Sequence, residues 1–459
     1  MSAIRRTVLG ACLCALLPAA SVAAAAPVPR GGAEPVRWLQ EYIQIDTTNP
    51  PGNEHEAAEF LAGILRREGI AVRLLESPGG RTSLYARLQA PGSEGRALVL
   101  MHHLDVVPAG HGWRVAPFSG RLLEGKIWGR GALDIKGLGI AHLAALIGLK
   151  REGGLHGRDL IYLAVADEET GGGQGAKWLL EEHPELFTGV EAVLGEGGSN
   201  RVFADRLIWW GIEVTQKRPL WLRVTARGRA GHASGLNPGS ATHQLIAGLA
   251  RLIDRPPRYR VTDGVRPFFR ALARLEGDPP SHLYYRLDEV IREDGPTEPL
   301  PPGLPVYFLD TVQVTRIDGS EAGNVVVPEA SAYVDVRMLP DSDGDALLAE
   351  IRDILGDRLE VEVVLTAPET AASPIDHRVY RALEEALAVR GPVVPTFISG
   401  TTDSRFFRQR GIAAYGFSPF SVNSNDLRGI HAADEYLPVD AFLRGIEMMR
   451  RVLIACAGR

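Results

Sequence analysis

Three adjacent carboxylates, Asp167, Glu168 and Glu169, follow an apolar run and precede a run of glycines in residues 161–173, IYLAVADEETGGG. Val, Ile, Tyr and Leu between polar and Gly-rich boundaries predict a buried strand, so the acids are expected where that strand meets a loop. Adjacent carboxylates repel one another unless a positive group holds them, and few Lys or Arg residues are near in sequence. The segment therefore predicts either a metal site or a solvated acidic loop.

A second candidate group is His103 with Asp105, directly after the strand expected at residues 97–101. The two-residue period of a strand points both side chains to one side, which suits a metal-binding imidazole whose orientation a carboxylate fixes. A hydrogen-bonded structural histidine is the alternative. His102 points to the other side and is interpreted as structural.

A third candidate is Asp134, which lies in the Gly-rich segment 127–137, IWGRGALDIKG. Glycines allow a tight turn and leave the carboxylate free to bridge two ions roughly 3.5–4 Å apart, as in two-metal hydrolases. A Gly-rich turn before a helix is the alternative. Of Glu168 and Glu169, one is then expected to bind a metal and the other to take a proton from the attacking water.

Two further residues have the right chemistry but a weak local signal. Glu196 lies in GEGG, just beyond a short strand, and His431 lies in GIHAADE before the last helix. Taken singly, the first suits any turn and the second an ordinary surface histidine.

The elements that must position these residues alternate along the chain. Strands are expected at residues 71–75, 83–88, 97–101, 160–166 and 192–194, with helices at 36–65, 139–150 and 174–182. Strands alternating with helices predict an α/β domain with helices on both faces of a central sheet. After residue 368 this pattern resumes, with a helix at 378–388, strands at 393–398 and 413–417, and a closing helix at 439–456.

A different pattern occupies the middle of the chain. Strands at 220–226, 306–314, 330–337 and 359–365, with helices at 241–252 and 346–355, give the order β-α-β-β-α-β of a split-βαβ sandwich. A Pro-rich, partly helical insert spans about residues 255–305, and nothing in its sequence names a ligand. The prediction is a catalytic domain in two parts, 36–217 and 367–459, with an inserted α+β lid or dimerisation domain at 218–366.

Composition limits the kind of protein. The 459 residues are 45% hydrophobic and 23% charged, with a formal net charge of −6, which is ordinary for a soluble protein of more than one domain. A nucleic-acid partner is not expected, because no cluster of Lys and Arg is present. The expected partner is a small molecule.

The N-terminus predicts export. Arg5-Arg6, an apolar run at residues 8–17 and an Ala-rich stretch before Pro27 are typical of a signal peptide covering residues 1–26, of the Sec or twin-arginine type. The run is too short for an integral membrane segment, so a secreted or periplasmic protein is expected. The mature chain would keep only Cys456 and form no intrachain disulfide.

Taken together, the motifs resemble a known family. HLDVVP, GRGALDIKG, ADEETGG, GEGG, GHAS, NVVVP, DVRMLP, GTTDSR and HAADE are similar, in sequence and order, to the two-zinc hydrolases that include aminoacylase, acetylornithine deacetylase, succinyl-diaminopimelate desuccinylase, and the glutamate and yeast vacuolar carboxypeptidases. The resemblance covers about residues 36–453. The GEGG motif and the long insert look most like the vacuolar-carboxypeptidase branch, which also holds secreted hydrolases of N-fatty-acyl amino acids.

The resemblance implies a role for each metal-site residue. His103 and Glu196 would hold one zinc ion, Glu169 and His431 would hold the other, and Asp134 would bridge them. Glu168 would be the general base, and Asp105 would orient His103. Family members often carry Asp where Glu196 stands. Carboxylate and imidazole sites also accept Co or Mn.

The resemblance also implies roles outside the metal site. His232, in GHAS, would stabilise the oxyanion, commonly in the active site of a partner subunit, which would require a homodimer. The residues expected to contact substrate are Asn324, Arg337, Thr402 and Asp403. An arginine suits bidentate capture of a free carboxylate. Without the resemblance, Arg337 would be interpreted as an exposed charged residue on a strand, and the Thr402–Asp403 segment as a turn.

The expected function is hydrolysis of the amide bond of an N-acyl amino acid or short peptide that has a free C-terminal carboxylate. An N-acetyl-amino-acid deacetylase differs from this only in the size of the acyl pocket. Two further candidates are a zinc aminopeptidase and a zinc-dependent peptide-binding protein without catalysis. Arg337 speaks against the aminopeptidase, and Glu168 with His232 speaks against the binding protein.

Overall fold

The computed structural model describes residues 30–204, 206–279 and 281–457, and the predicted signal peptide lies outside them. None of the described helices is long and apolar enough to cross a membrane. The single cysteine among the described residues, Cys456, is buried and free.

A nine-stranded mixed sheet forms the centre of the catalytic domain. Its order is β1-β2-β6-β3-β7-β19-β9-β18, and β8 pairs with β9 outside this path. The strands are β1 Val72–Glu76, β2 Thr82–Leu88, β3 Ala97–His103, β6 Asp159–Val165, β7 Val190–Gly195, β8 Arg201–Phe203, β9 Arg206–Gln216, β18 Val393–Ile398 and β19 Ala413–Gly416. Strands β3 and β6 are buried at every position, as expected for continuous apolar runs covered on both faces.

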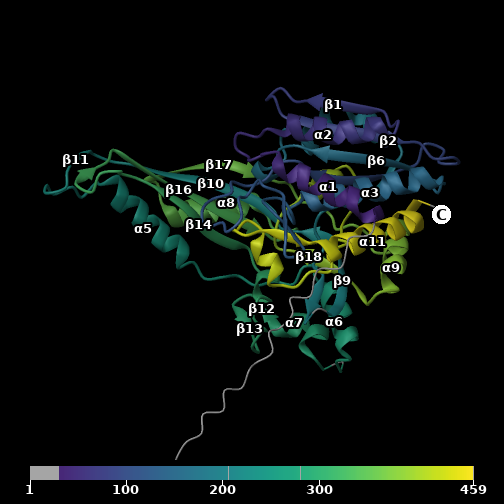
Figure 1. Cartoon of the computed structure of the whole chain (residues 1–459). Coiled ribbons are helices and arrows are strands. Elements are labelled where there is room, and N and C mark those ends of the chain that lie inside the picture. The colour runs from purple at the N-terminus through teal and green to yellow at the C-terminus, as the bar shows by residue number, and fades with distance from the viewer. Residues whose placement is uncertain (1–29, 205, 280, 458–459) are drawn as a thin grey trace, which may run out of the picture.

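Helices cover both faces of this sheet (Figure 1). One face packs in a single core with α1 Arg30–Gln44, α2 Glu54–Arg67, α3 Lys136–Glu152, α9 Arg378–Ala388 and α11 Val439–Ala457. The other face packs with the shorter α4 Ala176–Glu182 and α10 Ser404–Gln409. The predicted α/β class with helices on both faces is confirmed.

The middle of the chain forms a second, four-stranded antiparallel sheet with its own core. Its order is β14-β16-β10-β17, and α5 and α8 contribute to its core. The elements are β10 Arg218–Arg227, α5 Ala241–Ile253, β14 Thr311–Asp318, β16 Glu329–Met338, α8 Gly344–Leu355 and β17 Leu359–Thr366. The chain order is the predicted β-α-β-β-α-β. A short two-stranded sheet, in which β11 Gly231–His232 pairs with β15 Val325–Val326, lies at the outer tip of this lid, where Figure 1 labels β11.

Two strand predictions need correction. The strand expected at 306–314 begins only at Thr311, because Pro305–Tyr307 form a 3-10 turn. The eleven-residue strand β9 was not predicted at all. Its pattern is broken by Gly211, where a Cβ atom would lie 2.5 Å from the backbone nitrogen of Ser199. Glycine inside a strand often marks such a close approach and weakens the sequence signal.

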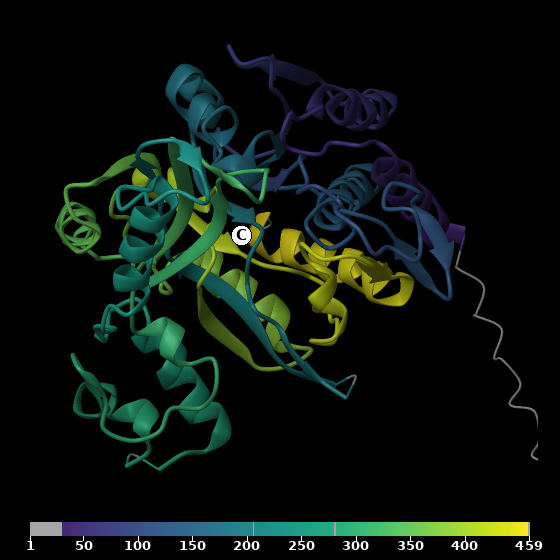
Figure 2. The same ribbon diagram turned by 90° about the vertical axis from the view of Figure 1, so that its left-hand side faces the viewer.

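The insert at residues 255–305 packs against the edge of the central sheet. It contains α6 Arg266–Glu276, α7 Leu287–Val290 and the short hairpin β12 Ile291–Arg292 with β13 Gly295–Pro296. Its aromatic core, which includes Phe268, Phe269 and Tyr284, also holds Val394 of β18. Figure 2 shows it as a separate lobe below the lid. The insert therefore covers the edge strand β18.

Candidate metal centre

Three neighbouring strands end at the same edge of the central sheet and carry half of the candidate residues. Strands β6 and β7 both run parallel to β3, whose last residue, His103, pairs with Val165 at the end of β6. Glu168 and Glu169 follow β6, and Glu196 follows β7. Parallel strands place their carboxyl ends together, so these side chains meet at one point.

Asp134 and His431 lie on two loops that are held side by side by a small sheet. Strand β5, Lys126–Trp128, pairs with β20, Tyr436–Pro438, so the loop after β5 lies beside the loop before β20. The buried Glu435 carboxylate ties the loops together, since it accepts hydrogen bonds from the backbone nitrogens of Leu133 (2.7 Å) and Asp134 (3.1 Å). Arg130 forms a buried ion pair with the same carboxylate at 2.7 Å.

The five predicted ligands form two groups that share Asp134. His103 Nε2 lies 3.3 Å from Asp134 Oδ1 and 3.7 Å from Glu196 Oε2. His431 Nε2 lies 3.1 Å from Asp134 Oδ2 and 3.3 Å from Glu169 Oε2. The two oxygens of Asp134 thus face different histidine–glutamate pairs, which is the arrangement that a bridging carboxylate needs.

The general-base candidate, Glu168, lies in the same cluster. It offers an oxygen within 4.8 Å of ligand atoms of His103 and Glu196, and a second such group joins His103, Asp134 and Glu169. Distance alone therefore also allows Glu168 to bind a metal, and an experiment must separate the two roles.

The charges of the cluster are strongly coupled. Burial, and then the negative charge of neighbouring acids, raises the pKa of Glu196 to about 8 and that of Glu168 well above its usual value. Hydrogen bonds to Asp134 and Glu169 raise the pKa of His431 to about 10. Burial opposes ionisation of Asp134, but its hydrogen bonds to the two histidines bring its pKa well below the usual value. Acids crowded in this way favour a bound cation.

One further observation supports a metal centre at this set of nitrogen and oxygen donors. Glu169 Oε1 is buried and has no hydrogen-bond partner among the described residues. A buried carboxylate oxygen without a partner is costly, and a cation would satisfy it. Imidazole nitrogens and carboxylate oxygens at these positions suit zinc, and also cobalt or manganese.

Two residues near the centre adopt left-handed backbone conformations, Asp167 with φ 71° and His431 with φ 58°. Such conformations are uncommon for residues other than glycine and are concentrated at functional sites. Asp167 itself is not free for a metal, because Arg81 Nη1 lies 3.0 Å from its Oδ1 and the backbone nitrogen of Gln174 donates to its Oδ2 at 2.9 Å. Asp167 is therefore balanced by neither a metal nor solvent, because its cation, Arg81, lies 86 residues away in the sequence.

Asp105 holds the loop that carries the two glutamates. Its carboxylate accepts hydrogen bonds from the backbone nitrogens of Glu168 (3.2 Å) and Glu169 (3.0 Å), and from Asn49 Nδ2 (2.8 Å). The nearest group to His103 Nδ1 is the backbone carbonyl of Asp105 at 2.8 Å, and the carboxylate is farther, at 3.6 Å. The hydrogen-bond partner of His103 Nδ1 is thus the backbone of Asp105 and not its carboxylate. The sequence did not single out Asn49 or Glu435.

Four of the five metal-ligand candidates, all except the buried His103, line an open cavity of about 550 Å³ between the two domains. Arg337 and Trp221 of the lid line it from one side. Arg337 donates to both oxygens of Asp335, at 2.8 and 3.1 Å, and its guanidinium lies 5.7 Å from the Trp221 ring centroid. No described residue of the 255–305 insert lines this cavity.

Thr402 and Asp403 lie behind the cavity, not on its surface. Thr402 Oγ1 donates to Gln216 Oε1 at 2.8 Å, and Thr402 is buried. Asp403 is 1% exposed, and neither carboxylate oxygen has a hydrogen-bond partner among the described residues, although Arg405 Nη2 lies 3.9 Å from Oδ1. Burial raises its pKa to about 7. Its neighbour Thr401, with Arg405, reaches the cavity instead.

His232 and Asn324 lie at the outer tip of the lid, at the far end from the central sheet (Figure 1). Both are exposed, and neither lines the metal-centre cavity. The nearest polar partner of His232 Nδ1 is Ser234 Oγ at 2.8 Å, and the Asn324 carbonyl accepts from Ala233 nitrogen at 3.2 Å. Within one chain, the structure does not bring these two predicted site residues to the others.

Comparison with known proteins agrees with this geometry. The model of peptidase family M20/M25/M40 matches residues 99–455. Human aminoacylase-1 is 28% identical over 442 residues, covering 92% of this chain and 95% of that protein. A probable succinyl-diaminopimelate desuccinylase of Staphylococcus epidermidis is 25% identical over 435 residues, covering 92% of this chain and 97% of that protein.

The fold has close counterparts among solved structures. An M20 family metallo-carboxypeptidase from Sulfolobus solfataricus aligns with a TM-score of 0.70 and 18% identity, over 93% of this chain and 100% of that chain. The family match spans well over half of the chain and includes all five ligand candidates and Glu168. The chain therefore belongs to peptidase family M20/M25/M40 and is a metal-dependent hydrolase of the amidohydrolase type.

Proposed function

We propose that the protein is a two-zinc enzyme that hydrolyses the amide bond joining an acyl or aminoacyl group to an amino acid with a free carboxylate. The observation that carries this proposal is the position of Asp134 between two histidine–glutamate pairs, in a cavity that also contains Arg337. The first feature supports amide hydrolysis by a dinuclear centre, and the second supports selection of a carboxylate.

In this proposal His103 and Glu196 would hold one ion, Glu169 and His431 would hold the other, and Asp134 would contact both. Bound there, the two ions would polarise the scissile carbonyl and make water a better nucleophile near neutral pH. The Glu168 carboxylate takes a proton from the attacking water and returns it to the nitrogen of the leaving amine. Asp105 holds Glu168 in place through its backbone nitrogen.

Arg337 is the proposed partner of the substrate carboxylate. Its Nε and Nη2 donate to the two oxygens of Asp335, which orients the planar guanidinium and leaves Nη1 to donate to a substrate carboxylate. Asn324, Thr402 and Asp403 remain predicted substrate-site residues. Movement of the lid about its junctions near Pro219 and Leu365, which both line the cavity, would bring the two domains closer around a substrate.

We further propose a homodimer in which His232 reaches the centre of the partner subunit and stabilises the oxyanion. This accounts for an exposed histidine at the lid tip. The edge strand β14 and helix α5 expose isoleucines that a partner would cover: Ile246 is 54%, Ile253 68% and Ile317 61% exposed. Contiguous exposed apolar residues of this kind mark interaction surfaces.

A deacetylase of N-acetyl amino acids is the second candidate, and similarity to aminoacylase-1 favours it. The two candidates share the metal centre and Arg337, and differ in the size of the acyl group that fits the cavity. The predicted signal peptide supports a secreted or periplasmic enzyme in either case.

The test is release of free amino acid by the zinc-loaded mature protein. Dipeptides, N-acetyl amino acids and long-chain N-acyl amino acids are compared, each with its C-terminal amide as the matched control. We expect turnover of the free acids and rejection of the amides. Equal turnover of the amides would favour an aminopeptidase, and no turnover of any substrate would favour a binding protein. Metal analysis of the protein as purified, before zinc loading, identifies the native ion.

A further inference from the structure

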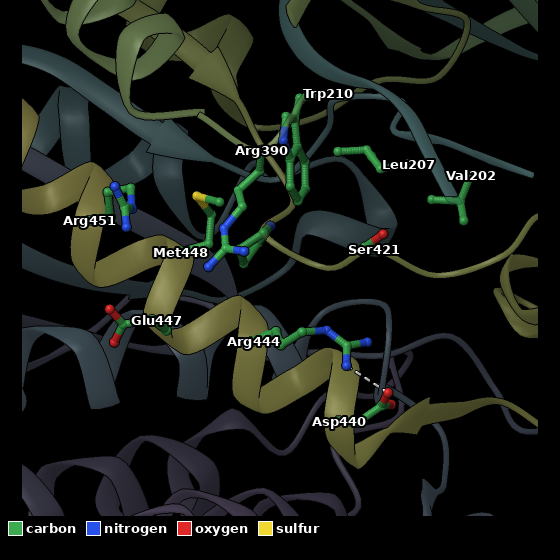
Figure 3. A pocket seen from close by; sticks show the side chains of 11 residues that line it. Val202, Leu207, Trp210, Arg390, Ser421, Asp440, Arg444, Glu447, Met448 and Arg451 are labelled. Atoms are coloured by element: carbon green, nitrogen blue, oxygen red, sulfur yellow. Dashed lines mark hydrogen bonds and ion pairs between the residues drawn. The ribbon is translucent and has the colours of Figure 1, made fainter. Parts of the chain in front are cut away.

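A second cavity lies on the catalytic domain, between the β8–β9 hairpin, the segment after β19 and helix α11 (Figure 3). Its volume is about 550 Å³, within the roughly 300–1,000 Å³ of small-molecule sites. It shares no lining residue with the metal-centre cavity. The proposed reaction uses none of its residues.

One wall of this cavity is apolar. Val202, Leu207, Trp210 and Met448 line it, and Figure 3 shows the Trp210 indole beside the space that Met448 also faces. Trp210 is 4% exposed, and its indole nitrogen has no acceptor among the described residues. A buried indole N–H normally has a partner, so this wall offers both apolar contact and an unused hydrogen-bond donor.

The cavity lining also includes three arginines. Helix α11 presents Arg444, Met448 and Arg451 on one face, since positions three and four residues apart lie side by side. The third arginine, Arg390, follows α9. Three arginines therefore stand against two acids, Asp440 and Glu447.

The two acids already have cations, but two of the arginines have no anion. Asp440 Oδ2 accepts from Arg444 Nη1 at 2.8 Å, and Glu447 lies 3.8 Å from Arg450. For the side chains of Arg390 and Arg451 the structure gives no ion pair or hydrogen bond with a described residue. Free guanidinium groups beside an apolar wall match an anion that has an apolar body.

We propose that this cavity is an accessory binding site for a small carboxylate with an apolar tail. The tail packs against Trp210, Leu207 and Met448, and the carboxylate binds Arg390 and Arg451. Because the inference depends only on this cavity, it does not rest on the proposed hydrolysis, and the two can fail independently.

The experiment measures octanoate binding to the zinc-loaded full-length protein by isothermal titration calorimetry. Octan-1-ol lacks the charge and acetate lacks the tail. These two probes therefore separate the contribution of the arginines from that of the apolar residues. We expect measurable binding of octanoate and much weaker binding of both controls. The double substitution Arg390→Ala with Arg451→Ala should weaken octanoate binding at least tenfold and leave kcat/KM for the amide substrate unchanged.

The matched control removes two exposed arginines that do not line the cavity, Arg381→Ala with Arg410→Ala, and should leave octanoate binding as it is. Several outcomes would overturn the proposal: no octanoate binding, equal binding of octan-1-ol, or equal affinity in the double variant. Loss of all binding in Arg337→Ala would instead place octanoate at the metal centre. A changed sedimentation coefficient of the double variant, without changed octanoate affinity, would identify the surface as a contact between copies of this chain.

Discussion

The metal-centre end of the catalytic domain and the tip of the lid both carry candidate site residues, but their surroundings differ. At the centre, hydrogen bonds to the buried carboxylates of Asp105 and Glu435 brace the loops that carry Glu169 and Asp134. At the lid tip, His232 is exposed, and its side chain makes local hydrogen bonds to Ser234.

The difference separates residues that one chain can organise by itself from those that need a further event. Buried hydrogen bonds between loops preorganise a site at the cost of flexibility, and the metal centre has such bonds. The exposed pair of two-residue strands β11 and β15 provides no such support, so the proposed role of His232 would require another surface to meet it. Arg337 is intermediate, because it belongs to the lid but lies at the end next to the catalytic domain.

The largest expected effect comes from Glu168→Gln, which tests the centre itself. The amide keeps the size of the side chain but cannot accept the proton, so kcat should fall by about 10³- to 10⁴-fold. Bound metal, measured by elemental analysis, should stay unchanged, and Glu181→Gln, at an exposed position of α4, is the control. Retained activity would remove Glu168 from the role of base, and loss of metal would make it a ligand.

The next effect tests the bracing of the centre through Glu435→Gln. This change leaves the buried Arg130 guanidinium without its counter-charge, which typically destabilises a protein by about 3 to 5 kcal/mol. The free energy of unfolding, measured in urea, should fall by that amount. The exposed pair of Arg66 and Glu59 has the same 2.7 Å separation, so Glu59→Gln is a matched control that should cost under about 1 kcal/mol. Equal effects would show that burial does not distinguish the two pairs.

The same contrast explains what could be predicted from sequence. His103, Glu168, Glu169 and Glu196 stand directly after apolar strand segments, and the edge of a parallel sheet then brings them together. The fold class and the order of elements in the lid followed from the same periodicities. Local sequence patterns were therefore sufficient to predict the candidate residues that lie at strand ends.

Other features depended on contacts between distant segments. Arg130 and Glu435 are 305 residues apart, and nothing near either residue marks the pair. Arg81 holds Asp167 across 86 residues, so the charge balance of the acidic loop was misjudged. The motif around His232 predicted a type of chemistry but not a position. The same local sequence at the tip of the lid could lie near the metal centre or far from it.

A third prediction asks whether the lid tip acts across subunits. His232→Ala should lower kcat by about 10²- to 10³-fold through loss of one oxyanion donor. Co-expression with Glu168→Gln provides the sharper test. In a mixed dimer, one of the two sites would combine an intact Glu168 with an intact His232 from the other subunit. Because random pairing makes about half of the dimers mixed, activity should recover to about a quarter of the wild-type value.

Ser234→Ala serves as the control, since it removes the hydroxyl beside the ring but keeps the imidazole. No recovery in the mixed dimer, with dimers verified by sedimentation, would place His232 within its own subunit or outside the reaction. A fully active monomer would contradict the proposed arrangement as a whole.

The smallest expected effect concerns the lid residue that already reaches the cavity. Arg337→Lys keeps the charge but loses the planar pair of donors, so KM for substrates with a free carboxylate should rise about 10- to 100-fold with little change in kcat. Turnover of the C-terminal amides should not change, and Arg316→Lys, an exposed arginine on β14, is the control. If Arg337→Lys lowered kcat and left KM unchanged, the arginine would act on the transition state and not on carboxylate recognition. The two ends of the lid would then share a catalytic role, and the contrast between them would disappear.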